Sequence, residues 1–354
     1  MRPTKTLHEI GQSLWLDNIT RNLITTGTLK TYIDEYSVTG LTSNPTIFDH
    51  AIKNSHDYDE AIQHSMGKGV TSEAIFFDLA IEDLCKAADL FLPIHKLTNM
   101  VDGWVSLEVS PLLAHDTSKT LAAAKALHAR VGRPNLFVKI PGTPEGLPAI
   151  EEAIFSGVPV NVTLLFSSEQ YAGAAEAYLK AVERRIEGGL DPDVPSVASL
   201  FVSRWDVAIA SEVPKHLQNR LGIAIAGQTF QSYESLLASS RWRRVFNAGG
   251  RAQRLLFAST GTKDPQAPDT LYIEGLAAPF TINTMPEATL KAFDDHGAIG
   301  SLVPARVFEL LAEFADAGID VGALATQLQD EGAASFVKSW NDLISCVASK
   351  SRIS

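Results

Sequence analysis

Short apolar runs alternate with amphipathic segments along the 354-residue chain. The runs have the length and the β-branched and aromatic residues of buried strands. Helical periodicity fills most of the intervals, and the clearest helix opens with a capping-box pattern at residues 167–170. We expect eight strands, at Ser13 to Leu16, Val38 to Thr42, Trp104 to Val109, Leu136 to Ile140, Val158 to Phe166, Val197 to Val202, Leu255 to Ser259 and Pro279 to Asn283.

This alternation indicates the fold class. Nearly continuous apolar strands separated by helices are typical of a parallel sheet with helices on its outer face, and eight such units indicate a closed (β/α)8, or TIM, barrel. An open doubly wound sheet is the alternative. Its first strand would normally lead into a G-x-G-x-x-G phosphate turn, whereas Leu16-Asp17-Asn18-Ile19 follows the first strand here.

We therefore predict one α/β domain over residues 1–354, a (β/α)8 barrel with extra helices. Residues 50–70 are polar and are expected to form an irregular excursion on one side of the barrel. Residues 307–348 show helical periodicity and are expected to form a helical tail. Its apolar stripe indicates core packing rather than partner binding, with Phe308, Leu311, Phe314, Phe336, Trp340 and Leu343 on the stripe.

Charge and composition restrict the classes of partner. A formal net charge of −11 disfavours nonspecific binding to nucleic acid or anionic lipid, so an anionic substrate requires local cations. The arginines at 241, 243 and 244 fit a solvated helix face. The start lacks a signal-peptide pattern and no apolar stretch is long enough to span a membrane, which leads us to expect a soluble, cytoplasmic protein. Cys85 and Cys346 are expected to be packing residues, and the scattered histidines do not predict a metal site.

Lys139 is the residue that most directly suggests a catalytic role. It lies within Leu136-Phe137-Val138-Lys139-Ile140-Pro141, an apolar strand in which an ammonium group is costly unless it is paired or neutralised. Desolvation favours the uncharged amine, which is a competent nucleophile toward a carbonyl and can form a Schiff base. A lysine that extends from the strand end into solvent is the alternative.

Polar residues collect where the predicted strands end, and the carboxyl ends of barrel strands are where such folds place their chemistry. Singly, Asp17 could cap a helix, Asn44 could be a turn residue before proline, and Thr163 could be a strand filler. Glu108 could form a purely structural ion pair with Lys139 on the adjacent strand. The whole set at strand ends consists of Asp17, Asn44, Glu108, Asn161, Thr163 and Ser199.

A phosphate pocket is predicted after the sixth and seventh strands. Ser199 to Arg204 supplies hydroxyl groups and a guanidinium that can bind phosphate in bidentate fashion. Ser259-Thr260-Gly261-Thr262-Lys263 follows the seventh strand, where barrels often bind phosphate. Asp264, next to Lys263, places a negative charge where phosphate binding would prefer none.

Five segments together resemble the transaldolase family, in particular its longer bacterial branch. The resemblance runs from about Leu7 to the C-terminal helix and is specific because all five occur in the family's order. They are SLWLDNITR from Ser13, GLTSNPTIF from Gly40, VKIP from Val138, NVTLLF from Asn161 and ASTGTK from Ala258.

The resemblance implies a (β/α)8 enzyme that needs no cofactor and acts on sugar phosphates of the pentose phosphate pathway. We expect the protein to be a monomer or a homodimer. It implies that Lys139 forms the Schiff base and that Asp17 handles the proton of the C4 hydroxyl. Glu108 and Thr163 match the pair that holds the catalytic water. The substrate-binding positions it implies are Asn44, Ser199, Phe201 and Arg204, with Ser259 and Lys263 standing where the short branch has a second phosphate-binding arginine.

Two alternatives share this scaffold. A fructose 6-phosphate aldolase would release dihydroxyacetone instead of transferring it; such aldolases commonly carry glutamine and tyrosine where this chain has Glu108 and Phe201. A catalytically silent barrel that only binds sugar phosphates is the other alternative, and the presence of Lys139, Asp17 and Glu108 argues against it.

The reaction implied by the resemblance to transaldolase is reversible transfer of dihydroxyacetone from sedoheptulose 7-phosphate to glyceraldehyde 3-phosphate, which gives erythrose 4-phosphate and fructose 6-phosphate.

Overall fold

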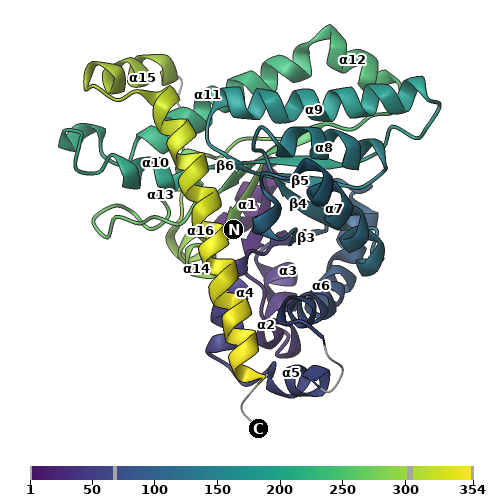
Figure 1. The fold of residues 1–354 in the computed structure, drawn as a ribbon. Coiled ribbons are helices and arrows are strands. Elements are labelled where there is room, and N and C mark those ends of the chain that lie inside the picture. Colours follow the sequence, from purple (N-terminus) through teal and green to yellow (C-terminus); the bar gives the residue numbers. More distant parts are fainter. Residues whose placement is uncertain (1, 67–69, 301–305, 352–354) are drawn as a thin grey trace.

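Eight parallel strands close into a barrel in chain order in the computed structural model, which describes residues 2–66, 70–300 and 306–351 (Figure 1). β1 pairs with both β2 and β8, which closes the sheet. The predicted (β/α)8 fold is confirmed. The strands are β1 (Ser13–Asp17), β2 (Val38–Thr42), β3 (Trp104–Glu108), β4 (Leu136–Pro141), β5 (Val160–Leu165), β6 (Ser196–Phe201), β7 (Gln253–Ala258) and β8 (Ile282–Met285).

Seven of these strands begin and end within two residues of the predicted bounds. The eighth begins three residues later than predicted, at Ile282 instead of Pro279. Proline has no N–H to donate to a strand ladder, and Phe280 takes a left-handed conformation with φ 60°. The extended backbone can therefore start only after this turn, which moves Thr284 and Met285 into the strand.

Helices surround the barrel and follow most strands (Figure 1). Their bounds are α1 (Pro3–Glu9), α2 (Arg21–Thr25), α3 (Thr28–Glu35), α4 (Pro45–Lys53), α5 (Asp59–Met66), α6 (Ser72–Leu97), α7 (Thr117–Val131), α8 (Gly146–Phe155), α9 (Ser168–Glu187), α10 (Ser203–Ala208), α11 (Leu221–Ala238), α12 (Ser240–Asn247), α13 (Leu271–Gly275), α14 (Glu287–His296), α15 (Val307–Asp316) and α16 (Val321–Lys350), with single 3-10 turns η1 (Pro111–Leu113) and η2 (Lys215–Leu217).

Residues 50–70 are more regular than expected. They contain the end of α4 and the whole of α5, and Tyr58 between these helices is fully buried. The Tyr58 hydroxyl accepts a hydrogen bond from the backbone N–H of Arg21 at 2.9 Å, which ties the segment to α2. The polar residues that suggested an irregular loop therefore lie mostly on exposed helix faces. Residues 67–69 of the predicted excursion lie outside the described residues.

The C-terminal tail consists of α15 and α16, and α16 crosses the molecule to pack against α4 and α6 (Figure 1). Phe336, Trp340 and Leu343 are buried as predicted. Phe308 is 62% exposed, so its placement on the core stripe was wrong. The buried face of α15 runs through Val307, Leu310 and Phe314 instead, and Phe308 is turned about 100° from it by its one-residue offset.

Three aromatic side chains, Trp15, Trp104 and Phe137, fill the barrel near the amino ends of its strands, with the Trp104 and Phe137 rings stacked 4.0 Å apart. On the outside of the barrel, Arg241 on α12 forms ion pairs with Glu176 and Glu183. This agrees with the prediction that the arginines at 241, 243 and 244 lie on a solvated helix face. Cys85 and Cys346 are free and half-buried. Across the described ranges, we find no helix with the length and apolar content to cross a membrane.

Candidate active site

A pocket of about 570 Å³ opens at the carboxyl ends of the strands. Every residue predicted for the site lines it, except Glu108. The lining comes from seven of the eight strands, all but β3, from the segments that follow them and from α16. A closed parallel barrel brings all the carboxyl ends of its strands to one rim. A second pocket, of about 720 Å³, lies at the amino ends and contains none of the predicted site residues.

Lys139 lies on β4 with only 6% of its surface exposed, so it does not extend into solvent. Its Nζ donates a hydrogen bond to the Ser43 carbonyl oxygen at 2.7 Å. Glu108 is the register partner of Lys139 on β3, and Glu108 Oε1 lies 3.7 Å from the Lys139 Nζ. This separation is an ion-pair distance but is too long for a hydrogen bond, so the amine keeps donor capacity for a substrate.

Glu108 sits behind Lys139 and is 6% exposed. Burial raises the pKa of this carboxyl, and the Lys139 charge offsets part of the rise. Among the described residues, neither Glu108 oxygen has a hydrogen-bond partner, and the same holds for the buried Thr163 hydroxyl. A carboxyl group with a raised pKa beside a buried amine is suited to giving and taking a proton near neutral pH.

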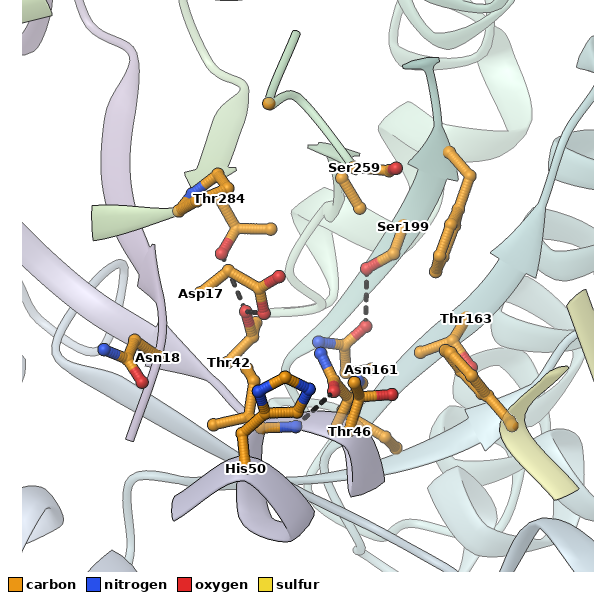
Figure 2. A pocket seen from close by; sticks show the side chains of 18 of the residues that line it. Asp17, Asn18, Thr42, Thr46, His50, Asn161, Thr163, Ser199, Ser259 and Thr284 are labelled. Atoms are coloured by element: carbon orange, nitrogen blue, oxygen red, sulfur yellow. Dashed lines mark hydrogen bonds between the residues drawn. The ribbon is translucent and has the colours of Figure 1, made fainter. Parts of the chain in front are cut away.

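Asp17 ends β1 and faces the pocket. Its Oδ1 accepts a hydrogen bond from Thr42 Oγ1 at 2.8 Å, and Thr42 is in turn 2.7 Å from the Thr284 hydroxyl (Figure 2). Burial raises the pKa of Asp17, with Lys139, the Thr42 hydrogen bond and Lys263 acting in the opposite direction. The alternative reading as a helix cap is wrong, because Thr20 caps α2 through the Leu23 N–H at 3.0 Å.

Asn44 and Ser199 both line the pocket. Asn44 caps α4, since its Oδ1 accepts from the Ile47 N–H at 3.0 Å, so its structural role before Pro45 is real. The same residue also lines the pocket. Ser199 donates from its hydroxyl to Asn161 Oδ1 at 2.7 Å, and Figure 2 shows this pair across the pocket from Asp17.

Arg204 lies on α10, directly after β6. Its guanidinium carbon is 5.3 Å from the centre of the Phe201 ring and 5.8 Å from that of Phe336. Burial lowers the pKa of Arg204, although arginine stays protonated. Within the part of the chain that the structure describes, its guanidinium makes neither a hydrogen bond nor an ion pair with another side chain. Arg204 lines the pocket, so its N–H groups can donate to an anion bound there.

The segment after β7 completes the rim. Ser259 and Lys263 both line the pocket, and the Ser259 hydroxyl is 2.9 Å from that of Ser203. Asp264 does not line it: its Oδ2 accepts from Asn219 Nδ2 at 2.7 Å and it faces a neighbouring cavity. The unfavourable charge next to Lys263 is therefore directed away from the predicted phosphate position.

Several pocket residues were not assigned a role from the sequence. Asn161 was noted at its strand end, and Thr42 and Thr284 also lie at strand ends, so the same signal could have included them. Two further lining residues are His50, which lies on α4, and Phe336, which lies on α16. No local pattern points to Phe336, since its place beside Arg204 depends on packing between segments 132 residues apart in the chain. In the described ranges, no three His, Cys, Asp or Glu side chains are grouped closely enough to hold a metal ion.

Comparison with known proteins agrees with this geometry. The sequence model of the transaldolase/fructose-6-phosphate aldolase family matches residues 14–346. A protein of Thermobifida fusca named transaldolase is 42% identical, covering 98% of this chain and 97% of the relative. A transaldolase of Saccharopolyspora erythraea is 43% identical, covering 96% and 95%, and transaldolase 2 of a Nostoc strain is 36% identical, covering 98% and 97%.

Proposed function

The chain belongs to the transaldolase/fructose-6-phosphate aldolase family, and on this premise we propose that it catalyses transaldolase transfer through a Schiff base on Lys139. The donor is sedoheptulose 7-phosphate or fructose 6-phosphate, and the acceptor is glyceraldehyde 3-phosphate or erythrose 4-phosphate. The observation that carries the proposal is the buried Lys139 amine, whose Nζ lies 3.7 Å from Oε1 of the buried Glu108 carboxyl, at a pocket that is also lined by Asp17 and Arg204.

Imine formation is the first step. The uncharged Lys139 amine adds to the C2 ketone, and the resulting carbinolamine must lose its hydroxyl group as water. Glu108 supplies the proton for that loss and takes it back when water returns in the final step. Its raised pKa favours this exchange, because the buried carboxyl holds a proton at a higher pH than an exposed one would. The Thr163 hydroxyl, which is buried and has no partner among the described residues, would orient the water.

Carbon–carbon cleavage follows. Asp17 removes the proton of the C4 hydroxyl, the C3–C4 bond breaks, and its electron pair moves into the iminium to leave an enamine on Lys139. The aldose phosphate departs with a new C4 carbonyl group. In the second half-reaction the enamine carbon attacks the acceptor aldehyde, whose oxygen takes the proton from Asp17. Thr42 donates to the Asp17 carboxylate and so orients it for both transfers.

Substrate orientation follows from the remaining lining. Asn44, Asn161 and Ser199 surround the region next to Lys139 and can hydrogen-bond the hydroxyl groups of the dihydroxyacetone unit. Arg204 binds the phosphate in bidentate fashion, with Ser259 and Lys263 beside it. These cations supply the local attraction that an acidic protein needs for an anionic substrate.

Transfer and simple aldol cleavage differ only in what happens to the enamine. Glu108 and Phe201 in this chain favour transfer, since Phe201 presents a ring without a hydroxyl group on the pocket wall, beneath Arg204. A phenyl ring offers no hydroxyl group that could hold a water molecule in the pocket, which favours an intermediate that persists until an aldehyde arrives.

Borohydride trapping tests the proposal. Incubation with fructose 6-phosphate and borohydride should add a reduced dihydroxyacetone unit to Lys139, located by peptide mapping, and erythrose 4-phosphate should suppress the adduct by accepting the unit. Lys139→Met should abolish trapping, while Lys338→Met, which changes an exposed lysine on α16, should not. Free dihydroxyacetone formed as fast as sedoheptulose 7-phosphate would instead assign the protein to the aldolases.

A further inference from the structure

The short helix α10 carries Arg204 and is held to its surroundings by the residues on either side. The Ser203 N–H donates to the Ser259 carbonyl oxygen at 3.0 Å. Trp205 is fully buried, and its Nε1 donates to the Phe166 carbonyl oxygen at 3.0 Å. A helix of six residues is not stable by itself, so tertiary contacts of this kind decide where it lies.

Asp206 makes the most extensive of these contacts and has no part in the proposed chemistry. Its Oδ1 accepts from the Leu221 N–H at 2.8 Å, and its Oδ2 accepts from the Gly222 N–H at 3.2 Å and the Tyr272 hydroxyl at 2.8 Å. One carboxylate thus joins α10 to the first turn of α11 and to α13. The fit is tight: a Cβ at Gly222 would lie 2.5 Å from the Val202 carbonyl oxygen and 2.8 Å from Asp206 Oδ2.

Arg204 depends on the position of α10. Over the described residues, no hydrogen bond or ion pair fixes its guanidinium, which lies over the Phe201 and Phe336 rings and close to Gly332, with the Glu331 charge acting on it from α16 without a direct ion pair. Ring contacts restrict the plane of the guanidinium but do not fix its direction along the pocket. The direction of Arg204 is therefore determined mainly by the backbone of α10, two residues before the carboxylate that anchors this helix.

We propose that Asp206 is a positioning residue that aims Arg204 at the phosphate of the substrate, an inference that rests on the proposed function. The anchor needs a carboxylate, because three donors converge on it and a neutral amide of the same shape offers only one acceptor oxygen. An error in α10 would be transmitted to the phosphate contact and not to Lys139, which lies on β4 and is held by Ser43.

The electrostatics of the Asp206 region are consistent with a functional role. Burial raises the pKa of Asp206 to about 6, partly offset by its hydrogen bonds from Tyr272, Leu221 and Gly222. The charged groups that line the same cavity are Lys263 and Asp264. Ionising a buried carboxyl costs free energy, so a carboxylate is unfavourable where only a structural link is needed. Positioning Arg204, two residues earlier in the chain, would explain why a carboxylate is present here.

Asp206→Asn tests the inference. It preserves side-chain size but leaves the Gly222 N–H and the Tyr272 hydroxyl facing an amide donor. Loss of one such hydrogen bond should raise KM for fructose 6-phosphate about fivefold to tenfold, while kcat/KM for unphosphorylated fructose and the rate of borohydride trapping at saturating fructose 6-phosphate change less than about twofold. Tyr272→Phe removes one of the three donors and should give a smaller shift in the same direction, which keeps the test decisive if Asp206→Asn folds poorly.

A double-mutant cycle separates positioning from general destabilisation. In an Arg204→Ala background, Asp206→Asn should cause no further rise in KM, because the group it positions is gone. Asp193→Asn is the matched control: this half-buried carboxylate binds Arg251 at 3.0 Å at the other end of the barrel and should alter melting temperature without selective loss of the phosphorylated substrate. Equal losses for fructose and fructose 6-phosphate, or additive losses in the double variant, would overturn the inference. Absence of wild-type trapping at Lys139 would instead overturn the proposed function.

Discussion

Arg204→Ala is the substitution for which the structure gives the sharpest quantitative expectation. The Arg204 guanidinium lines the pocket, and burial lowers its pKa, which reflects how little water surrounds its charge. A bidentate phosphate contact consists of two charge-assisted hydrogen bonds, worth about 1.5–3 kcal/mol each. At the lower value, the two hydrogen bonds together contribute about 3 kcal/mol, which corresponds to a loss of about 100-fold in kcat/KM for fructose 6-phosphate, since about 1.4 kcal/mol is a factor of 10.

Lys263 provides the internal comparison. It is exposed at the rim, and an exposed charge contributes about 0.2–1 kcal/mol. Lys263→Ala should therefore reduce kcat/KM by about fivefold at most. This difference between two cations of one pocket follows from burial alone and does not depend on which of them the phosphate contacts first.

The assay compares fructose 6-phosphate with unphosphorylated fructose in each variant, at fixed ionic strength because exposed charges are screened by salt. Arg204→Ala should affect fructose by no more than about twofold. Arg243→Ala, which removes an exposed arginine on α12, should affect neither substrate. Removing a desolvated cation should not lower the melting temperature by much. Equal loss of efficiency toward both sugars would refute the assignment of Arg204 to the phosphate.

Four further outcomes are expected. Lys139→Arg should lose turnover and trapping, because a guanidinium stays protonated and cannot form an imine. Asp17→Asn should form the imine with the intact ketose, which borohydride traps at a nearly normal rate, but should turn over slowly, whereas Glu108→Gln should slow imine trapping itself. Equal loss of imine trapping and turnover in both variants would show that these carboxylates only support Lys139 structurally. Gly40→Ala should lower the free energy of unfolding by about 1–3 kcal/mol, seen as a lower melting temperature, since its Cβ would lie 2.7 Å from an indole ring. The pKa of Asp206 rises from 3.8 to about 6 on folding, so the folded chain binds this proton more tightly than the unfolded chain. The free energy of unfolding should therefore fall by up to about 3 kcal/mol as the pH rises from 4 to 6. Thermal melts of Asp206→Asn should lack this pH dependence.

Strand ends were the part of the site that the sequence could predict. Lys139, Glu108 and Asp17 are conspicuous because each interrupts or ends an apolar run, and the barrel topology then requires their strands to meet at one rim. The eighth strand was misplaced because a left-handed residue at Phe280 is not evident from composition. That error excluded Thr284, the partner of Thr42 next to Asp17.

Contacts made by α16 could not be predicted from the sequence. Phe336 reaches the Arg204 guanidinium, and Gln329 donates to the carbonyl oxygens of Gly142 and Leu164. The latter contact stabilises a bulge in β5, where Leu164 takes φ 57° directly after Thr163. Periodicity identified α16 as an amphipathic helix, but which strand ends it covers depends on packing between distant parts of the chain. The sequence also could not tell that Asp264 binds Asn219 and does not line the predicted phosphate pocket.

The energetics of the pocket distinguish its functional residues from its structural ones. Polar groups such as Ser199 and Asn44 satisfy each other or cap helices, so they cost the fold little. Asp17 and Glu108 differ, because burial raises the pKa of both, so the folded state binds a proton on either carboxyl more tightly than the unfolded chain does. When they are ionised, these two carboxyls beside one buried amine lower the stability of the folded state relative to exposed carboxyls. A proton-transfer role explains this cost, because the same raised pKa values that destabilise the ionised forms place both groups closer to the pH at which they must exchange protons.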